Sequence, residues 1–159
     1  MSAAAERRRG RTRFLVLAIA YAALIFAVSQ IPGRELARVG ITVWDKAVHA
    51  LEYLPLGALI AAWLASWRRP AGPRARLGVL AIAVAAVFAW AVLDEIHQAF
   101  VPGRQPAAGD VVADLVGGLL GGVLALAAGR RSAGGGGEPL DELDPGEDEE
   151  PVEALPRDP

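Results

Sequence analysis

Residues 77–93 read LGVLAIAVAAVFAWAVL, an apolar run of 17 residues without a charged side chain. As an α-helix this run would be about 25 Å long, which is close to the thickness of a bilayer core. It lacks the polar stripe that a soluble amphipathic helix turns toward water. The run therefore predicts a helix that is buried on all sides, as a membrane span is.

Three further apolar runs accompany it. They cover residues 14–28, or 14–31 with Ser29 and Gln30 included, residues 47–67 and residues 111–129. A soluble protein of 159 residues with four such helices would have almost nothing left to face water. The expected fold class is all-α, a polytopic membrane protein with a four-transmembrane-helix bundle. The expected spans are about residues 14–31, 47–67, 77–97 and 111–129.

The composition excludes several classes of site and of protein. The chain contains no Cys, so it has no disulfide, no thiolate nucleophile and no Cys-ligated metal site. Hydrophobic residues make up 53% of the chain and stand in long blocks, unlike the short periodic runs of a soluble enzyme. We expect membrane lipids as partners, and neither nucleic acid nor a cofactor.

The net charge of −2 hides an asymmetry along the chain. Residues 1–137 carry a net charge of +7, and residues 138–159 carry −9. The segment 132–159 is acidic and lacks apolar periodicity, which predicts a disordered cytoplasmic tail because it cannot offset its ordering entropy by burial. Residues 1–13 then form a basic cytoplasmic N-terminus, and residues 14–131 form the membrane domain.

The Lys and Arg residues predict the orientation. With the N-terminus inside, 11 Arg lie on cytoplasmic segments and only 4 Lys or Arg lie in outer loops. The positive-inside rule favours this arrangement, with both termini cytoplasmic. An alternative is that the first apolar run is a signal peptide cleaved after Ala27-Val28-Ser29, which would leave three spans in the same orientation.

Ionisable side chains gather at three span ends that share the outer face in this topology. At about 100° per residue, Asp45, His49 and Glu52 fall on one face of the second span. Charged groups in a membrane are costly, so their convergence on one face indicates a function. The catalytic candidates are His49, Glu52, Asp94 and His97. The binding candidates are Asp45, Lys46, Tyr53, Glu95, Gln98, Arg104, Asp110 and Asp114.

A structural role is the alternative for these residues. Asp45 and Asp110 stand near helix N-termini, where carboxylates cap and favour the dipole. Asp94 or Glu95 could pair with Arg104, whose direction is set by the Pro102-Gly103 turn. A zinc site from His49, His97 and a carboxylate is a weaker alternative, because no HExxH motif is present; no metal is expected.

The fourth span also contains two overlapping GxxxG patterns, which permit close approach of helices. They are formed by Gly117, Gly118, Gly121 and Gly122. Packing inside the bundle is one interpretation. The alternative is a homodimer through Gly117 and Gly121.

Four motifs follow one another along the chain. They are Ser29-Gln30, Asp45-Lys46-x-x-His49-x-x-Glu52-Tyr53, Asp94-Glu95-x-His97-Gln98-x-Phe100-x-Pro102-Gly103-Arg104 and Asp110-x-x-x-Asp114-x-x-Gly117-x-x-x-Gly121. In these motifs the chain resembles the VanZ-like proteins, named for a teicoplanin-resistance protein, over about residues 14–129. The resemblance implies a small multi-pass protein of the bacterial plasma membrane, with altered susceptibility to teicoplanin-type glycopeptides in some members. Asp114 stands where the family frequently has Asn.

Three functions fit these features. In the first, the protein acts at the outer face on a cell-envelope lipid or peptidoglycan precursor, and Lys46 and Arg104 hold its anionic head group. In the second, it is an enzyme on a lipid-linked or phosphate-containing substrate, with His97 or His49 as acid–base and Asp94 orienting it. In the third, it is a structural or interaction protein whose polar residues lock the helices together.

Overall fold

The computed structural model describes residues 2–38 and 45–134, and all regular structure within them is helical. The long helices are α1 (Ala3–Ser29), α3 (Asp45–Arg68), α4 (Pro73–Gln98) and α5 (Ala108–Gly134), and α2 (Gly33–Arg38) is a short one. Each long helix contains a segment long and apolar enough to cross a membrane. The predicted all-α fold with four potential spans is confirmed.

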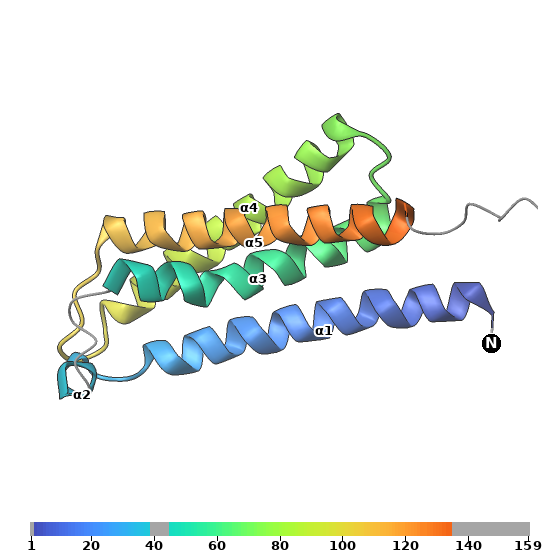
Figure 1. The fold of residues 1–159 in the computed structure, drawn as a ribbon. Helices are drawn as coiled ribbons and strands as arrows, with labels where there is room; N and C mark the ends of the chain where they lie inside the picture. Colours follow the sequence, from blue (N-terminus) through green and yellow to red (C-terminus); the bar gives the residue numbers. More distant parts are fainter. Residues whose placement is uncertain (1, 39–44, 135–159) are drawn as a thin grey trace, which may run out of the picture.

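The four long helices form one bundle around α3, which contacts α1, α4 and α5. The axes of α1, α3 and α5 are nearly aligned, with α1 antiparallel to the other two, and α4 crosses them at an angle (Figure 1). Two ends can therefore be distinguished. The basic end holds the start of α1, the α3–α4 connection and the end of α5, and the cluster end holds α2, the ends of α1 and α4 and the starts of α3 and α5.

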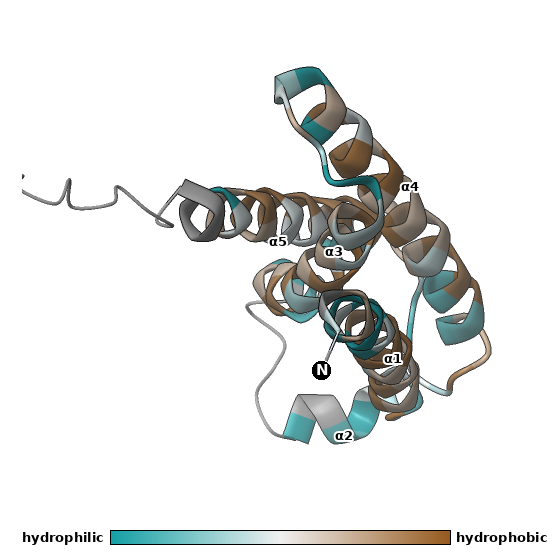
Figure 2. Ribbon diagram, turned by 90° about the vertical axis from the view of Figure 1, so that its right-hand side faces the viewer, coloured by the Kyte–Doolittle hydropathy of each residue, from teal (hydrophilic) through white to brown (hydrophobic). Residues whose placement is uncertain are grey.

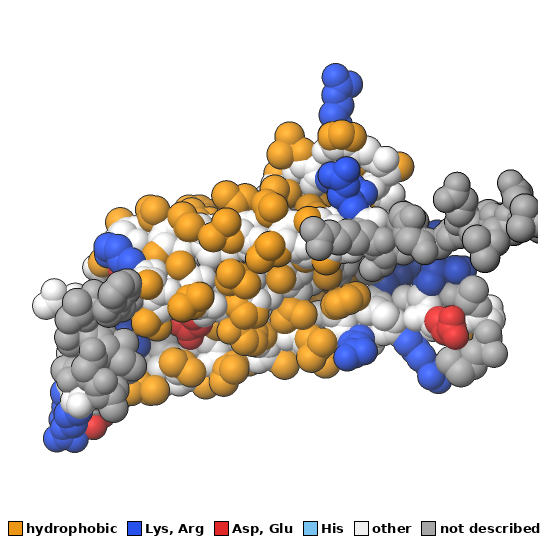
Figure 3. All heavy atoms as spheres, viewed as in Figure 1, with side chains coloured by type: hydrophobic (Ala, Val, Ile, Leu, Met, Phe, Trp, Pro, Cys, Tyr) orange, Lys and Arg blue, Asp and Glu red, His pale blue; other side chains and the backbone are white. Residues whose placement is uncertain are grey.

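The lateral surface of the bundle is apolar. Large hydrophobic side chains such as Leu51 and Phe100 are 69% and 80% exposed. Hydrophobic side chains cover the middle of the visible face in Figure 3, and hydrophilic residues colour α2 and the tips of α1 and α4 in Figure 2. Since water would penalise such a surface, lipid is the environment that suits it.

The helices extend further than the apolar runs. Helix α1 begins at Ala3, eleven residues before Phe14, with the Ser2 hydroxyl accepting from the Ala4 N–H. Arg is a good helix former, and extending a formed helix costs less than nucleating one, so the basic segment continues the span as helix. Helix α5 likewise includes residues 132–134. Residues 135–159 lie outside the described residues, so the disordered tail stays a prediction.

Two features were not expected from the sequence, namely helix α2 and a backbone contact between the α1–α2 and α4–α5 connections. Helix α2 lies between the first two spans, and it contains too few apolar residues to give a periodic signal. Its first residue, Gly33, donates from its N–H to the Pro102 carbonyl at 3.2 Å. A Cβ at Gly33 would collide with the Gly103 carbonyl, so these two connections pack backbone to backbone.

The buried core lies where α1, α3 and α4 meet. Tyr53 and Leu56 of α3 pack with Ile25 of α1 and with Val87 and Ala91 of α4. Tyr53 is completely buried. It therefore contributes to packing between helices at the level just below the polar residues of α3.

Glycines bring α3 and α5 into direct backbone contact. A Cβ at Gly117 would collide with the Ala50 carbonyl, and one at Gly121 with the Leu54 carbonyl. Small residues at such crossings allow the close packing that drives helix association in membranes. The α3-facing sides of both glycines are thus occupied within the chain, and association of two chains through them stays a prediction.

The glycine contact predicts a specific loss of stability. Gly121→Ala should destabilise the bundle by about 1–3 kcal/mol, because the new methyl group forces α5 away from the Leu54 carbonyl. The matched control is Gly78→Ala in α4, where a Cβ meets nothing within 4 Å. Denaturant unfolding of the purified chain in detergent measures both. Equal unfolding midpoints for the two variants would contradict the assigned role of Gly121.

Candidate functional site

The cluster end concentrates the buried polar groups of the molecule. Among the described residues, every buried polar or charged side chain lies there, and none lies at the basic end. The helices that supply them are α1, α3, α4 and α5, as the topology predicted for the last three. These residues are Ser29, His49, Asp94, Glu95, Gln98, Asp110 and Asp114.

One group of contacts joins α3 to α5. His49 Nδ1 lies 3.0 Å from Asp114 Oδ1, and His49 Nε2 lies 3.7 Å from Asp110 Oδ2. Lys46 Nζ donates to Asp110 Oδ1 at 3.1 Å. Lys46 and His49, three residues apart on α3, thus face Asp110 and Asp114, four residues apart on α5. We call these four residues the His49 group.

A second group joins α1 to α4. Asp94 Oδ1 is 2.6 Å from the Ser29 hydroxyl, and Asp94 Oδ2 accepts from Gln98 Nε2 at 2.9 Å. Both carboxylate oxygens are therefore used within the bundle. Ser29 was not among the predicted site residues. Its position at the end of an apolar run, beside Gln30, is the sequence feature that could have indicated it.

His97 belongs to neither group. Its Nε2 lies 2.6 Å from Gln30 Nε2, and its ring lies 4.4 Å from the ring of Phe26. Among the described residues Asp94 bonds to Ser29 and Gln98, so the geometry does not favour the expectation that Asp94 orients His97. His49, held by Asp114, is the histidine that a carboxylate orients.

Arg104 lies on the α4–α5 connection, where Gly103 has a φ of +75°. Its Nε donates to the Ile31 carbonyl at 3.3 Å. No ion pair joins it to a described residue, so the alternative of a salt bridge with Asp94 or Glu95 is not formed. The turn brings Arg104 to the α1–α2 connection, where it meets the Ile31 carbonyl.

The remaining candidates differ in exposure. Glu52 is half-buried on α3, within electrostatic range of His49, Asp94 and Asp114. The Tyr53 hydroxyl is buried and has no hydrogen-bond partner among the described residues. The side chain of Asp45 lies outside the described residues.

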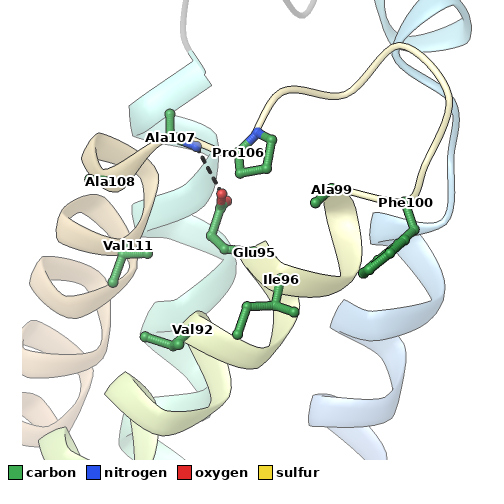
Figure 4. A pocket seen from close by; sticks show the side chains of 9 residues that line it. All are labelled: Val92, Glu95, Ile96, Ala99, Phe100, Pro106, Ala107, Ala108 and Val111. Carbon is green, nitrogen blue, oxygen red and sulfur yellow. Dashed lines mark hydrogen bonds between the residues drawn. The ribbon is translucent and has the colours of Figure 1, made fainter.

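A pocket of about 410 Å³ opens between the end of α4 and the start of α5. Figure 4 shows Glu95 reaching from α4 toward the Ala107 N–H, which Glu95 Oε2 accepts at 2.9 Å. Apart from this carboxylate the lining side chains are apolar. They are Val92, Ile96, Ala99, Phe100, Pro106, Ala107, Ala108 and Val111.

The chain is similar to one known protein family. Residues 6–129 match the model of one family, described as VanZ/LLP1. No curated protein and no solved structure matches the chain. The match covers all four spans and every candidate site residue, and the chain belongs to the VanZ/LLP1 family.

Proposed function

We propose that this VanZ/LLP1 protein acts at the outer face of the bacterial plasma membrane on an anionic cell-envelope lipid or peptidoglycan precursor. Through that action it affects susceptibility to teicoplanin-type glycopeptides. The observation that carries the proposal is the position of the buried polar and charged residues, which among the described residues all lie at the cluster end. Ionisable groups kept inside a membrane domain are functional candidates by default.

The orientation follows from the charges at the two ends. The basic end carries eleven Arg, on the first half of α1, around the α3–α4 connection and at the end of α5. The cluster end carries Arg34, Arg38, Lys46 and Arg104. The positive-inside rule then supports a cytoplasmic basic end and an outward-facing cluster end.

Two cations at the cluster end are suited to hold an anionic head group. The Lys46 side chain is 66% exposed and forms an ion pair with Asp110. Arg104 gives only its Nε to the Ile31 carbonyl. The Lys46 ammonium has three N–H donors and gives one of them to Asp110, so it can donate to a phosphate while it keeps this ion pair. The guanidinium of Arg104 can bind phosphate with two parallel hydrogen bonds.

The pocket beside Glu95 supports a lipid over a soluble anion. It lies on the apolar flank of α4 and α5, next to the exposed Ile96 and Phe100. An apolar chain in this pocket would place a polar head at the level of Glu95 and the cluster end. At the same end of the bundle, Glu52 is half-buried and His49 and Asp94 are buried.

The orientation predicts how introduced cysteines react. The natural chain has none, so each single-cysteine variant reports one position. Arg34→Cys, on the exposed side of α2, should react with a membrane-impermeant maleimide in intact cells. Arg74→Cys, exposed at the start of α4, should react only after the cells are permeabilised. The reverse pattern would place the cluster end in the cytoplasm and contradict the proposal.

The head-group role predicts a phenotype for Arg104. In a strain whose teicoplanin susceptibility changes on deletion of the gene, Arg104→Ala should behave like the deletion. Loss of a charged hydrogen bond weakens anion binding by about 10–100-fold. Arg104→Lys should retain part of the function, and Arg74→Ala at the basic end should resemble the wild type.

The measurement is the minimal inhibitory concentration of teicoplanin, with protein levels in the membrane checked by immunoblot. Wild-type susceptibility in both Arg104→Ala and His97→Ala would show that the cluster end is irrelevant to this phenotype. Equal effects of Arg104→Ala and Arg74→Ala would show that only the overall charge matters.

A further inference from the structure

We infer that His49, Glu95 and Asp110 form a binding site for one divalent metal ion, and that Zn²⁺ is the ion this ligand set fits best. The three residues come from α3, α4 and α5, and all three are buried. Their ligand atoms lie within 4.8 Å of one another. This set differs from the zinc alternative that the sequence suggested, because Glu95 takes the place of His97.

The spacing is close to that of a coordination sphere. Zinc binds imidazole nitrogen and carboxylate oxygen at about 2.0–2.2 Å, which separates neighbouring ligand atoms of a tetrahedron by about 3.3–3.6 Å. His49 Nε2 and Asp110 Oδ2 are 3.7 Å apart. Small side-chain rotations would bring the three ligands onto one ion.

Glu95 supplies an independent observation. Glu95 is only 6% exposed, and its Oε2 accepts a hydrogen bond from the Ala107 N–H. Its Oε1 is buried and has no hydrogen-bond partner among the described residues. A buried carboxylate oxygen without a partner is costly, and coordination of a cation would remove that cost.

Asp114 holds His49 as metal-bound histidines are commonly held. Asp114 Oδ1 lies 3.0 Å from Nδ1, so Nε2 is the nitrogen on the side of Asp110. A carboxylate on the far nitrogen fixes the ring and its tautomer and increases the basicity of the ligating nitrogen. Asp114 is itself almost completely buried, which makes this support rigid.

The charges also favour a divalent cation. Glu95 and Asp110 bring two carboxylates to one buried place, and Lys46 reaches Asp110 from a largely exposed position. One imidazole with two carboxylates suits zinc, whereas magnesium and calcium prefer oxygen ligands throughout. Three protein ligands leave a fourth position. Because Glu95 lines the pocket, that position suits a water molecule or, if the proposed function holds, a lipid phosphate oxygen.

The test measures zinc on the purified full chain in detergent, carrying an affinity tag without histidine. After treatment with EDTA and dialysis against Zn²⁺, mass spectrometry of the metal content should count one zinc per chain. His49→Ala, Glu95→Gln and Asp110→Asn should each abolish tight binding. Asp114→Asn should weaken it by about 10–100-fold, because only the support of His49 is altered.

Two controls fix the ligand set. Glu35→Gln removes an exposed carboxylate of α2 and should leave one zinc per chain. His97→Ala should also retain zinc, and loss of zinc there would overturn the assignment in favour of the pair of histidines. Circular dichroism and gel filtration check that each variant is folded.

Absence of zinc in the folded wild-type chain would overturn the inference, whatever the variants do. Retention of zinc in all three ligand variants would overturn it as well. A gain in the unfolding temperature of the wild type on addition of Zn²⁺, absent in Glu95→Gln, gives independent support. Since no lipid or antibiotic enters these measurements, their failure is separable from failure of the susceptibility experiment.

Discussion

The direct backbone contact between α3 and α5 determines both the apolar packing of the bundle and the arrangement of its polar residues. Gly117 and Gly121 remove the side chains that would hold the helices apart, and their neighbours across the contact are the Ala50 and Leu54 carbonyls. This contact fixes the register of the two helices. One turn further toward the cluster end, the same register brings His49 opposite Asp114 and Lys46 opposite Asp110. The apolar packing and the polar site are thus consequences of one helix crossing.

The polar residues of the cluster end differ in how fully their hydrogen-bonding atoms are used. Asp94 uses both oxygens on Ser29 and Gln98, so its contribution is to hold α1 and α4 together. In contrast, Glu95 has an oxygen without a described partner, and Arg104 keeps its terminal nitrogens outside any described ion pair. Asp94 thus holds two helices together, whereas Glu95 and Arg104 keep polar atoms with which they could contact a ligand.

The sequence predicts the fold well because each span is a long apolar run, and length alone decides such a case. It also predicts that the polar residues of α3, α4 and α5 converge, since alternating spans bring those three ends to one face.

The sequence could not predict which of these polar side chains contact each other. Helical periodicity places His49 on a face of its own helix, but whether that face meets Asp114 or His97 depends on helix rotation and crossing angle. For the same reason the sequence did not predict Ser29 as the partner of Asp94. The helix ends and α2 lie in polar segments, where no apolar periodicity marks the boundaries.

The polar bonds of the cluster end have a consequence for biogenesis. Ser29 and Asp94 are separated by 65 positions along the chain, and so are His49 and Asp114. During synthesis α1 and α3 reach the membrane before their partners have left the ribosome. We expect their polar groups to stay at the membrane–water interface, where water can hydrogen-bond to them, until α4 and α5 are inserted. Insertion of α5 would then allow His49 to enter the bundle, so the contacts between α3 and α5 would form late in assembly.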